Sequence, residues 1–197
     1  MKPLATTLTL ATALLLAAAC GNQKTSKEVS AESPVPTKPV ASVDPIKRGE
    51  YLVTIGGCND CHTPFKMGEK GAEPDMSLML SGHPETLVMP EAPKPNGPWI
   101  WSAAGTNTAF AGPWGVTYTA NLTPDPNTGL GIWTEEQFIQ TLRTGRHWGV
   151  ARPIMPPMPW QNYGLATDED LKAIFAYLKS IKPIANHVPA YQPPPAS

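Results

Sequence analysis

The sequence predicts a mainly α-helical domain with one long irregular insertion, and three observations lead to this fold class. Residues 134–145 and 167–178 carry helix-capping signals followed by apolar residues at helical spacing. Residues 45–55 combine small and apolar side chains and end at two glycines. Residues 64–120, the insertion, are rich in proline, glycine and tryptophan and show little helical periodicity.

The first predicted helix covers residues 45–55. Asp44 can cap its first turn, Pro45 suits the first helical position, and Gly56 and Gly57 end it. One face of this helix is expected to carry small or apolar side chains, which are Ile46, Gly49, Tyr51, Leu52 and Ile55.

The other two predicted helices have clear starts. Thr134 and Gln137 match a capping box, and Gly145 ends the helix that follows. Thr167 caps the last helix, in which apolar residues recur at positions i, i+3, i+4 and i+7. These apolar residues are Leu171, Ile174, Phe175 and Leu178. Residues 116–119 are the best candidate for a strand.

Residues 58–62 form a C-x-x-C-H motif, in which Cys58, Cys61 and His62 carry the chemistry. Two thiols three positions apart on a helical turn can add to the two vinyl groups of one porphyrin, and the histidine that follows can bind its iron. A thioredoxin-like redox pair or half of a zinc site would need partners that the sequence lacks. The motif therefore predicts one covalently bound haem c, with His62 as the proximal iron ligand.

The first 19 residues are typical of an export signal, since Lys2 precedes an apolar run that is short for a membrane span. The residues before Cys20 resemble a bacterial lipobox, in which the cysteine becomes the lipid-modified first residue of the mature chain. An ordinary secretory signal cut after Ala19 is the alternative. Lipidation would account for Cys20, the one cysteine that haem attachment leaves over.

Composition sets the expected domain boundaries. Residues 20–44 are polar and rich in proline, which predicts a disordered tether. Residues 45–185 should form the folded domain, and residues 186–197 a loose C-terminal tail. The 15 Lys and Arg residues balance 16 Asp and Glu residues, which argues against a nucleic-acid partner. We expect an exported, periplasmic protein anchored to a membrane through a lipid.

The sixth position on the iron decides between an electron carrier and a ligand-binding haem. Residues 152–160 place Met155 and Met158 among prolines, which can fix a loop that presents a thioether to the iron. Met158 is the preferred distal ligand and Met155 is its nearest rival, while either could simply pack in the core. Bis-histidine ligation is the remaining possibility, and its candidates are His83, His147 and His187.

Several stretches resemble a known family. The helix that leads into C-x-x-C-H resembles the N-terminal element of class I cytochromes c. The motifs N-L-T-P-D at 121–125, T-G-L-G-I-W-T at 128–134, P-M-P-W at 157–160 and D-E-D-L at 168–171 resemble the haem domains of cytochrome subunits from membrane-associated alcohol and aldehyde dehydrogenases and their stand-alone relatives.

This resemblance implies a cytochrome c-like helical haem domain whose first and last helices cross beside the haem. It also implies that Met158, in the Pro-x-Met-Pro-aromatic stretch, is the axial ligand. Trp160 stands where the family usually carries tyrosine, a change that keeps an aromatic ring and a hydrogen-bond donor.

The expected function follows from the ligands. An iron bound by both His62 and Met158 can change oxidation state but cannot bind substrate, so we expect a periplasmic-side one-electron carrier and not an enzyme. Its partners would be redox proteins, namely a dehydrogenase, a quinol-oxidising complex or a terminal oxidase. The alternatives are a dedicated cytochrome subunit of a membrane-associated dehydrogenase and an open-site haem sensor or peroxidase.

Two further expectations concern the surroundings of the haem. Residues 64–120 would either lie over the edge of the macrocycle or dock a redox partner. The candidates to pair with the haem propionates are Arg143, Arg146, Trp133 and Trp160.

Overall fold

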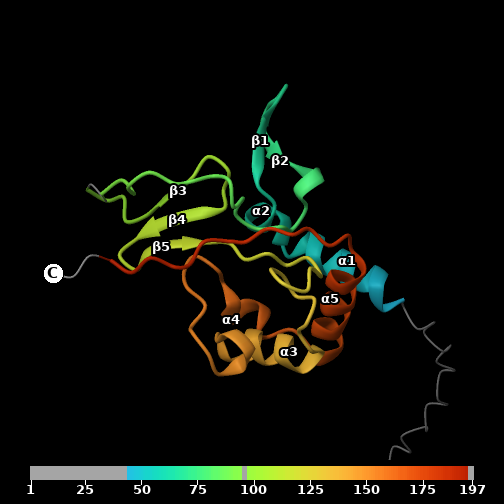
Figure 1. Cartoon of the computed structure of the whole chain (residues 1–197). Coiled ribbons are helices and arrows are strands. Elements are labelled where there is room, and N and C mark those ends of the chain that lie inside the picture. Colours follow the sequence, from blue (N-terminus) through green and yellow to red (C-terminus); the bar gives the residue numbers. More distant parts are fainter. Residues whose placement is uncertain (1–43, 95–96, 195–197) are drawn as a thin grey trace, which may run out of the picture. The chain divides into compact units, whose positions relative to one another are not determined.

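The computed structural model describes residues 44–94 and 97–194 (Figure 1). The signal peptide, Cys20 and the tether up to residue 43 lie outside these residues. The α-helices are α1 (Pro45–Ile55), α2 (Cys58–His62), α3 (Glu135–Thr144), α4 (Trp160–Tyr163) and α5 (Asp168–Ser180). The strands are β1 (Phe65–Gly68), β2 (Gly71–Pro74), β3 (Ser102–Ala103), β4 (Ala109–Gly112) and β5 (Gly115–Tyr118), and the 3₁₀ turns are η1 (Met76–Leu78) and η2 (His147–Gly149). Within the described ranges, no helix has the length and apolar character needed to cross a membrane.

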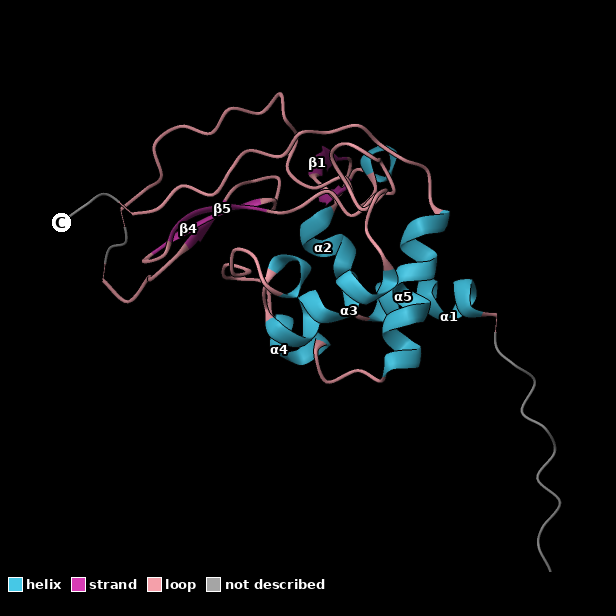
Figure 2. Cartoon of the chain, turned by 60° about the horizontal axis from the view of Figure 1, so that its bottom comes forward, coloured by secondary structure: helices cyan, strands magenta, loops and turns pink. Residues whose placement is uncertain are grey.

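The prediction of a mainly α-helical, cytochrome c-like helical domain is wrong as to fold class. The structure is 33% helical and 14% strand, with an antiparallel pair β1-β2 and an antiparallel sheet β3-β4-β5. The strands lie within the expected irregular insertion, where short runs between glycines pair as hairpins that helical periodicity does not detect. Figure 2 shows these strands on a different side of the domain from the helices. Only β5 matches the strand expected at 116–119.

The three long helices begin where the sequence predicts. The Asp44 side chain accepts a hydrogen bond from the Ile46 N–H at the start of α1 (2.9 Å). The side chains and backbone of Thr134 and Gln137 form the reciprocal capping box of α3. Thr167 caps α5. Each cap satisfies backbone donors that the first turn of a helix leaves free.

The core lies between α1, α3 and α5 (Figure 1). The predicted apolar stripe of α5 is buried, as its four residues Leu171, Ile174, Phe175 and Leu178 all belong to the core. The buried residues of α1 are Gly49 and Val53. Three residues of the expected small or apolar face of α1 are exposed, namely Ile46, Tyr51 and Ile55. The helix therefore turns its smallest residue, not its largest, toward α5.

Residues 181–194, here called the C-terminal strap, run from α5 back to the three-stranded sheet (red in Figure 1). Asn186 is buried, and its side-chain amide donates to the carbonyls of Ser81 (2.7 Å) and His83 (2.9 Å). Gln192 exchanges two backbone hydrogen bonds with Val116 of β5. The sequence predicts a loose tail over residues 186–197, and within the described part of that tail Asn186 and Gln192 make the contacts given above.

Candidate haem-attachment site

The C-x-x-C-H motif folds as α2, a single helical turn directly after α1. Gly57 starts this turn with a φ of 65°, in the left-handed region that favours glycine. Cys58 and Cys61 are half-buried free thiols on the turn, and His62 ends it. The motif therefore presents two thiols and an imidazole from one short element, which is the arrangement that attachment of a single porphyrin needs.

Burial changes the acidity of both thiols. It raises the pKa of Cys58 to about 11 and also raises the pKa of Cys61, and the nearby carboxylate of Asp60 acts in the same direction. Reactive redox cysteines depend on a lowered pKa, because the thiolate is the nucleophile. The raised pKa values therefore give no support to the thioredoxin-like alternative.

A backbone carbonyl from a distant part of the chain orients the imidazole of His62. Its Nδ1 lies 2.8 Å from the carbonyl oxygen of Ala120. Because a carbonyl only accepts, Nδ1 carries the proton and donates it, and Nε2 keeps its lone pair. Burial lowers the pKa of His62, which favours the neutral ring. A neutral imidazole whose other nitrogen is held in this way is prepared to bind a metal.

Further hydrogen bonds fix the chain around the end of α2. The Thr63 hydroxyl donates to Oδ1 of Asn59 and accepts from the Leu80 N–H, both at 2.8 Å. The carbonyl of His62 accepts from the Gly82 N–H, also at 2.8 Å. Thr63 is fully buried. Residues 80–82 are therefore held against the segment that carries the predicted proximal ligand.

The methionine loop, residues 152–159, is anchored to two other elements. The Ile154 N–H donates to the carbonyl of Gly145 at the end of α3 (2.8 Å). The Thr117 hydroxyl of β5 donates to the carbonyl of Pro156 (2.8 Å). The loop therefore has a defined backbone, as its proline content predicts.

The two candidate methionines have different surroundings. Met158 is partly buried and packs against the hydrophobic core. Met155 is buried to a similar intermediate extent, but it is not among the side chains that pack against that core. The packing of Met158 would hold its thioether in one place, which supports the preference for Met158 while leaving ligation a prediction.

Helix α4 follows Met158 after one residue and connects the methionine loop to the attachment turn. The Tyr163 hydroxyl donates to the carbonyl of Gly56, the residue that ends α1. The ring of Tyr163 is also close to this turn, since a Cβ on Gly56 would lie 3.3 Å from it. The ring of Trp160 packs against Gly145. Helix α4 therefore joins the two segments that are expected to supply the iron ligands.

Replacing Tyr163 by phenylalanine should lower the free energy of unfolding by about 1 kcal/mol, the usual net value of one hydrogen bond. It should also increase the fraction of ferrous protein that binds carbon monoxide, because the methionine loop would be tied less firmly to α2. Tyr191→Phe is a matched control, since the Tyr191 hydroxyl donates to the carbonyl of Trp114, in the β-sheet region. The expectation fails if both variants bind carbon monoxide equally.

His83 is fully buried, and both of its ring nitrogens are occupied. Nε2 donates to the carbonyl of Leu87 (3.0 Å), so Nδ1 accepts from the Thr108 hydroxyl (2.9 Å). The ring also lies against that of Tyr118, with 4.8 Å between centroids. These contacts give His83 a structural role in joining the loop after η1 to the sheet.

Acidification below a pH of about 6.5 should destabilise the fold through His83. Burial lowers the pKa of His83, so the unfolded chain binds the proton more readily than the folded protein, and stability is lost as the pH falls below the unfolded pKa. The loss is at most about 1.4 kcal/mol for each pH unit. Denaturant unfolding at several pH values gives the free energy of unfolding as a function of pH. This free energy should fall less steeply on acidification in His83→Gln than in wild type. His187 is exposed, so His187→Gln should keep the wild-type dependence of the free energy of unfolding on pH. The same dependence in all three proteins would contradict this role of His83.

The other two histidines lie in different settings. His147 is half-buried in η2, and its ring meets that of Trp133 edge-on, with 6.0 Å between centroids. Burial, together with the charge of Arg152, lowers the pKa of His147 to about 4. His187 is exposed on the C-terminal strap. Bis-histidine ligation therefore has no single favoured partner among these residues.

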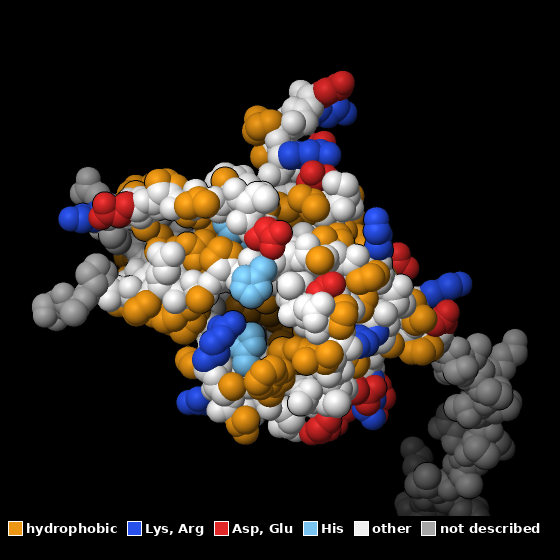
Figure 3. Space-filling model, viewed as in Figure 1, with side chains coloured by type: hydrophobic (Ala, Val, Ile, Leu, Met, Phe, Trp, Pro, Cys, Tyr) orange, Lys and Arg blue, Asp and Glu red, His pale blue; other side chains and the backbone are white. Residues whose placement is uncertain are grey.

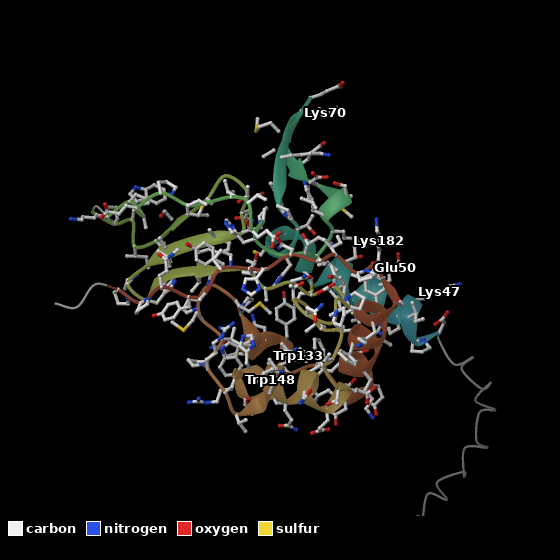
Figure 4. All side chains as sticks on the ribbon, in the orientation of Figure 1. Lys47, Glu50, Lys70, Trp133, Trp148 and Lys182 are labelled. Atoms are coloured by element: carbon white, nitrogen blue, oxygen red, sulfur yellow. The ribbon has the colours of Figure 1, made fainter. Side chains whose placement is uncertain are left out.

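A hollow opens near the middle of the face shown in Figure 3, with His side chains and a Lys or Arg side chain at its edge. Trp133 and Trp148 lie below it in the same orientation (Figure 4). The hollow is lined largely by hydrophobic side chains (Figure 3). An apolar recess with a cation at its edge suits a macrocycle that has an apolar body and carboxylates on one side. The donor set and the recess therefore fit a haem.

The arginines expected to pair with the haem propionates already have partners. Arg143 forms an ion pair with Asp168 (2.5 Å) and donates to the carbonyl of Gly164. Arg146 donates to the carbonyl of Ala151 (3.0 Å). Arg143 is therefore already paired with a carboxylate, whereas Arg146 keeps further N–H donors that could reach a propionate.

Arg152, which the sequence analysis did not single out, is the better candidate. Burial lowers its pKa, yet within the described ranges none of the ion pairs involves its guanidinium. It also lies close enough to His147 to depress the pKa of that ring. Arg152 is nevertheless exposed at the surface. A cation without a carboxylate partner in this part of the chain can pair with an anionic group of a ligand.

Known proteins with similar sequences are cytochrome subunits. The chain is 29% identical over 194 residues to the fructose dehydrogenase cytochrome subunit of Gluconobacter japonicus, which covers 98% of the chain and 31% of that protein. It is 31% identical over 144 residues to the gluconate 2-dehydrogenase cytochrome c subunit of Pantoea cypripedii, which covers 71% of the chain and 24% of that protein. It is 35% identical over 158 residues to the alcohol dehydrogenase (quinone) cytochrome c subunit of Komagataeibacter europaeus, which covers 77% of the chain and 28% of that protein. The chain resembles the cytochrome c subunits of dehydrogenases, which supports its being a c-type cytochrome.

The chain spans about a quarter to a third of the length of these curated relatives. No family model matches it. The relatives are named as the cytochrome subunits of fructose, gluconate and alcohol dehydrogenases. The comparison confirms the resemblance to dehydrogenase cytochrome subunits that the motifs at 121–171 led us to expect.

Proposed function

We propose that the chain is a c-type cytochrome that carries single electrons on one haem c bonded to Cys58 and Cys61. His62 is the proximal iron ligand and Met158 the distal one, with Met155 as the rival. The observation that carries the proposal is the hydrogen bond from His62 to the carbonyl of Ala120, since it leaves Nε2 of an attachment-motif histidine ready to bind iron.

The bound haem would supply an iron that exchanges one electron at a time. The residues of the chain would set its environment. His62 and Met158 would fill both axial positions, which excludes substrate from the iron, and thioether ligation with burial would raise the reduction potential. Arg152 would pair with a propionate and add a positive charge that favours the reduced form.

A dehydrogenase is the electron donor that the comparisons favour, because the matched relatives are cytochrome subunits of fructose, gluconate and alcohol dehydrogenases. The cytochrome would serve such an enzyme either as a dedicated subunit or as a separate shuttle to a quinol-oxidising complex or terminal oxidase. We place it on the periplasmic side of the membrane, held there by a lipid on Cys20 and the tether that follows.

Intact mass of the mature protein tests haem attachment directly. Made in a host competent for haem maturation, the protein should exceed the mass of its polypeptide and lipid by that of one haem, and its pyridine haemochrome spectrum should be that of haem c. The double variant Cys58→Ser, Cys61→Ser should lose both signals. A wild-type mass equal to polypeptide plus lipid would overturn the proposal.

Purification from the native membrane distinguishes a dedicated dehydrogenase subunit from a separate shuttle. A dedicated subunit should copurify in fixed stoichiometry with a dehydrogenase, whereas a shuttle should separate from it in detergent. Cys20→Ala in the full chain should release the cytochrome from the membrane fraction if the lipid provides the anchor.

A further inference from the structure

Two segments of the chain hold His62 through their backbone, residues 80–83 and residues 119–123, and we call them together the histidine cradle. Nδ1 of His62 donates to the carbonyl of Ala120 (2.8 Å). The backbone carbonyl of His62 accepts from the Gly82 N–H (2.8 Å). Because a peptide group is planar, the direction of the Ala120 carbonyl depends on the contacts that hold the backbone next to it.

Asn121, the residue after Ala120, is buried, and its side chain is held at both ends. Its Oδ1 accepts from the N–H (2.9 Å) and the hydroxyl (2.7 Å) of Thr123. Its Nδ2 donates to the carbonyl of Ile184 in the C-terminal strap (2.8 Å) and to the hydroxyl of Thr128 (3.1 Å). The strap therefore helps to fix the peptide group that joins Ala120 to Asn121.

Asn186, also in the strap, holds the other segment of the cradle. Its side-chain amide donates to the carbonyls of Ser81 and His83, the residues on either side of Gly82. Its backbone N–H donates to the Thr128 hydroxyl (3.1 Å), which also accepts from the side chain of the other asparagine. The Thr128 hydroxyl is therefore the point at which the contacts of both cradle segments meet.

This network is buried and polar, since Asn121 is 4% exposed and Asn186 is 7% exposed. Burying an amide costs free energy unless its donors and acceptors find partners. A buried network whose members are satisfied holds its groups in one arrangement. The network therefore fixes the direction of the groups that contact His62.

We propose that Asn121, Thr128 and Asn186 are positioning residues for the haem, because they hold the carbonyl of Ala120 against Nδ1 of His62. The inference rests on the proposed electron-transfer function, in which His62 is the proximal iron ligand. A carbonyl that accepts from Nδ1 makes Nε2 more basic, and a more basic ligand favours ferric over ferrous iron. The strap thereby lowers the reduction potential through residues that are not iron ligands.

Replacing Thr128 tests the proposal, since Thr128→Val removes the hydroxyl at similar size and Thr128→Ser keeps it. In the haem-loaded full chain, Thr128→Val should raise the reduction potential. At the potential where wild type is half reduced, its ratio of ferrous to ferric protein should be at least about threefold higher. This is about 28 mV, because a tenfold change in a one-electron couple is about 59 mV. Thr128→Ser should keep the wild-type ratio, and Asn186→Ala should raise it at least as much as Thr128→Val.

The hydrogen bond to Ala120 gives a second measurement. In isotope-labelled ferrous protein followed by NMR, the Nδ1 proton of His62 should exchange with heavy water at least about tenfold faster in Thr128→Val than in wild type, because the bond opens more often. Tyr191→Phe is the control for a weakened strap, since it removes a hydrogen bond to Trp114, outside the cradle. It should change neither the potential nor the exchange rate.

A haem-loaded Thr128→Val with the wild-type potential and exchange rate would overturn the positioning role, whatever happens in Asn186→Ala. Equal shifts in Thr128→Ser or Tyr191→Phe would do the same, because the potential would then follow a general loosening of the strap. Loss of haem from Thr128→Val would also count against the role, since positioning leaves attachment intact. A wild-type protein without covalent haem would instead overturn the proposed function, and the positioning role with it.

Discussion

Replacing Met158 by alanine should open the iron to external ligands. Wild-type ferrous protein should be six-coordinate and low-spin and should ignore carbon monoxide, because His62 and Met158 fill both axial positions. Met158→Ala should bind carbon monoxide readily and shift toward a high-spin spectrum. Its reduction potential should fall by on the order of a hundred millivolts or more, since axial ligands are a main determinant of haem potential. Absorption spectra with and without carbon monoxide, and a redox titration, measure both effects.

Met155→Ala is the matched control, because it removes the same side chain three residues away in the same proline-fixed loop. It should keep the low-spin spectrum and resist carbon monoxide. If Met155→Ala opens the iron and Met158→Ala does not, the ligand is Met155. If wild type itself binds carbon monoxide and neither variant changes the spectrum, the open-site sensor or peroxidase becomes the better description.

The helices could be predicted from the sequence because their signals are local. The capping pair Thr134 and Gln137 lies within one turn, and the stripe that begins at Leu171 lies within three. The strands could not be predicted in the same way. β1 and β2 are four residues long, and their pairing depends on a partner strand and not on periodicity. The mainly α-helical prediction therefore failed in the insertion, where non-local pairing decides the structure.

The same difference between local and non-local features applies to the candidate site. The attachment motif is contiguous and was recognisable at once, but the partner of His62 is the backbone carbonyl of Ala120, 58 residues away. A carbonyl has no residue-specific signal, so sequence reasoning could not find it. Arg152 stands beside the proline-methionine stretch, which was a usable clue. Preferring it over Arg143 required the knowledge that Asp168 already pairs with Arg143.

Replacing Gly49 by alanine should destabilise the protein strongly, although alanine is the better helix former by about 1 kcal/mol. A Cβ at this position would lie 2.0 Å from the carbonyl oxygen of Ala173 and 2.7 Å from the Cβ of Tyr177, both on α5. The first of these is backbone and the second is the stem of a side chain, so no rotamer change relieves the clash. Helices α1 and α5 would have to separate, which loosens the packing of Val53 and Leu171, both essentially fully buried.

The cost of the clash between the added Cβ and α5 should exceed the gain in helix propensity. The substitution should therefore lower the free energy of unfolding by more than about 2 kcal/mol. Denaturant unfolding of the haem-loaded protein, followed by circular dichroism, measures the change. Gly105→Ala is the control, because a Cβ there meets no atom within 4 Å and should leave the stability near that of wild type. A stabilised Gly49→Ala would mean that α1 and α5 are further apart than the structure has them. Because α2 follows α1 after two glycines, any separation of the two helices should also move Cys58 and His62, so Gly49→Ala should incorporate less haem than Gly105→Ala does.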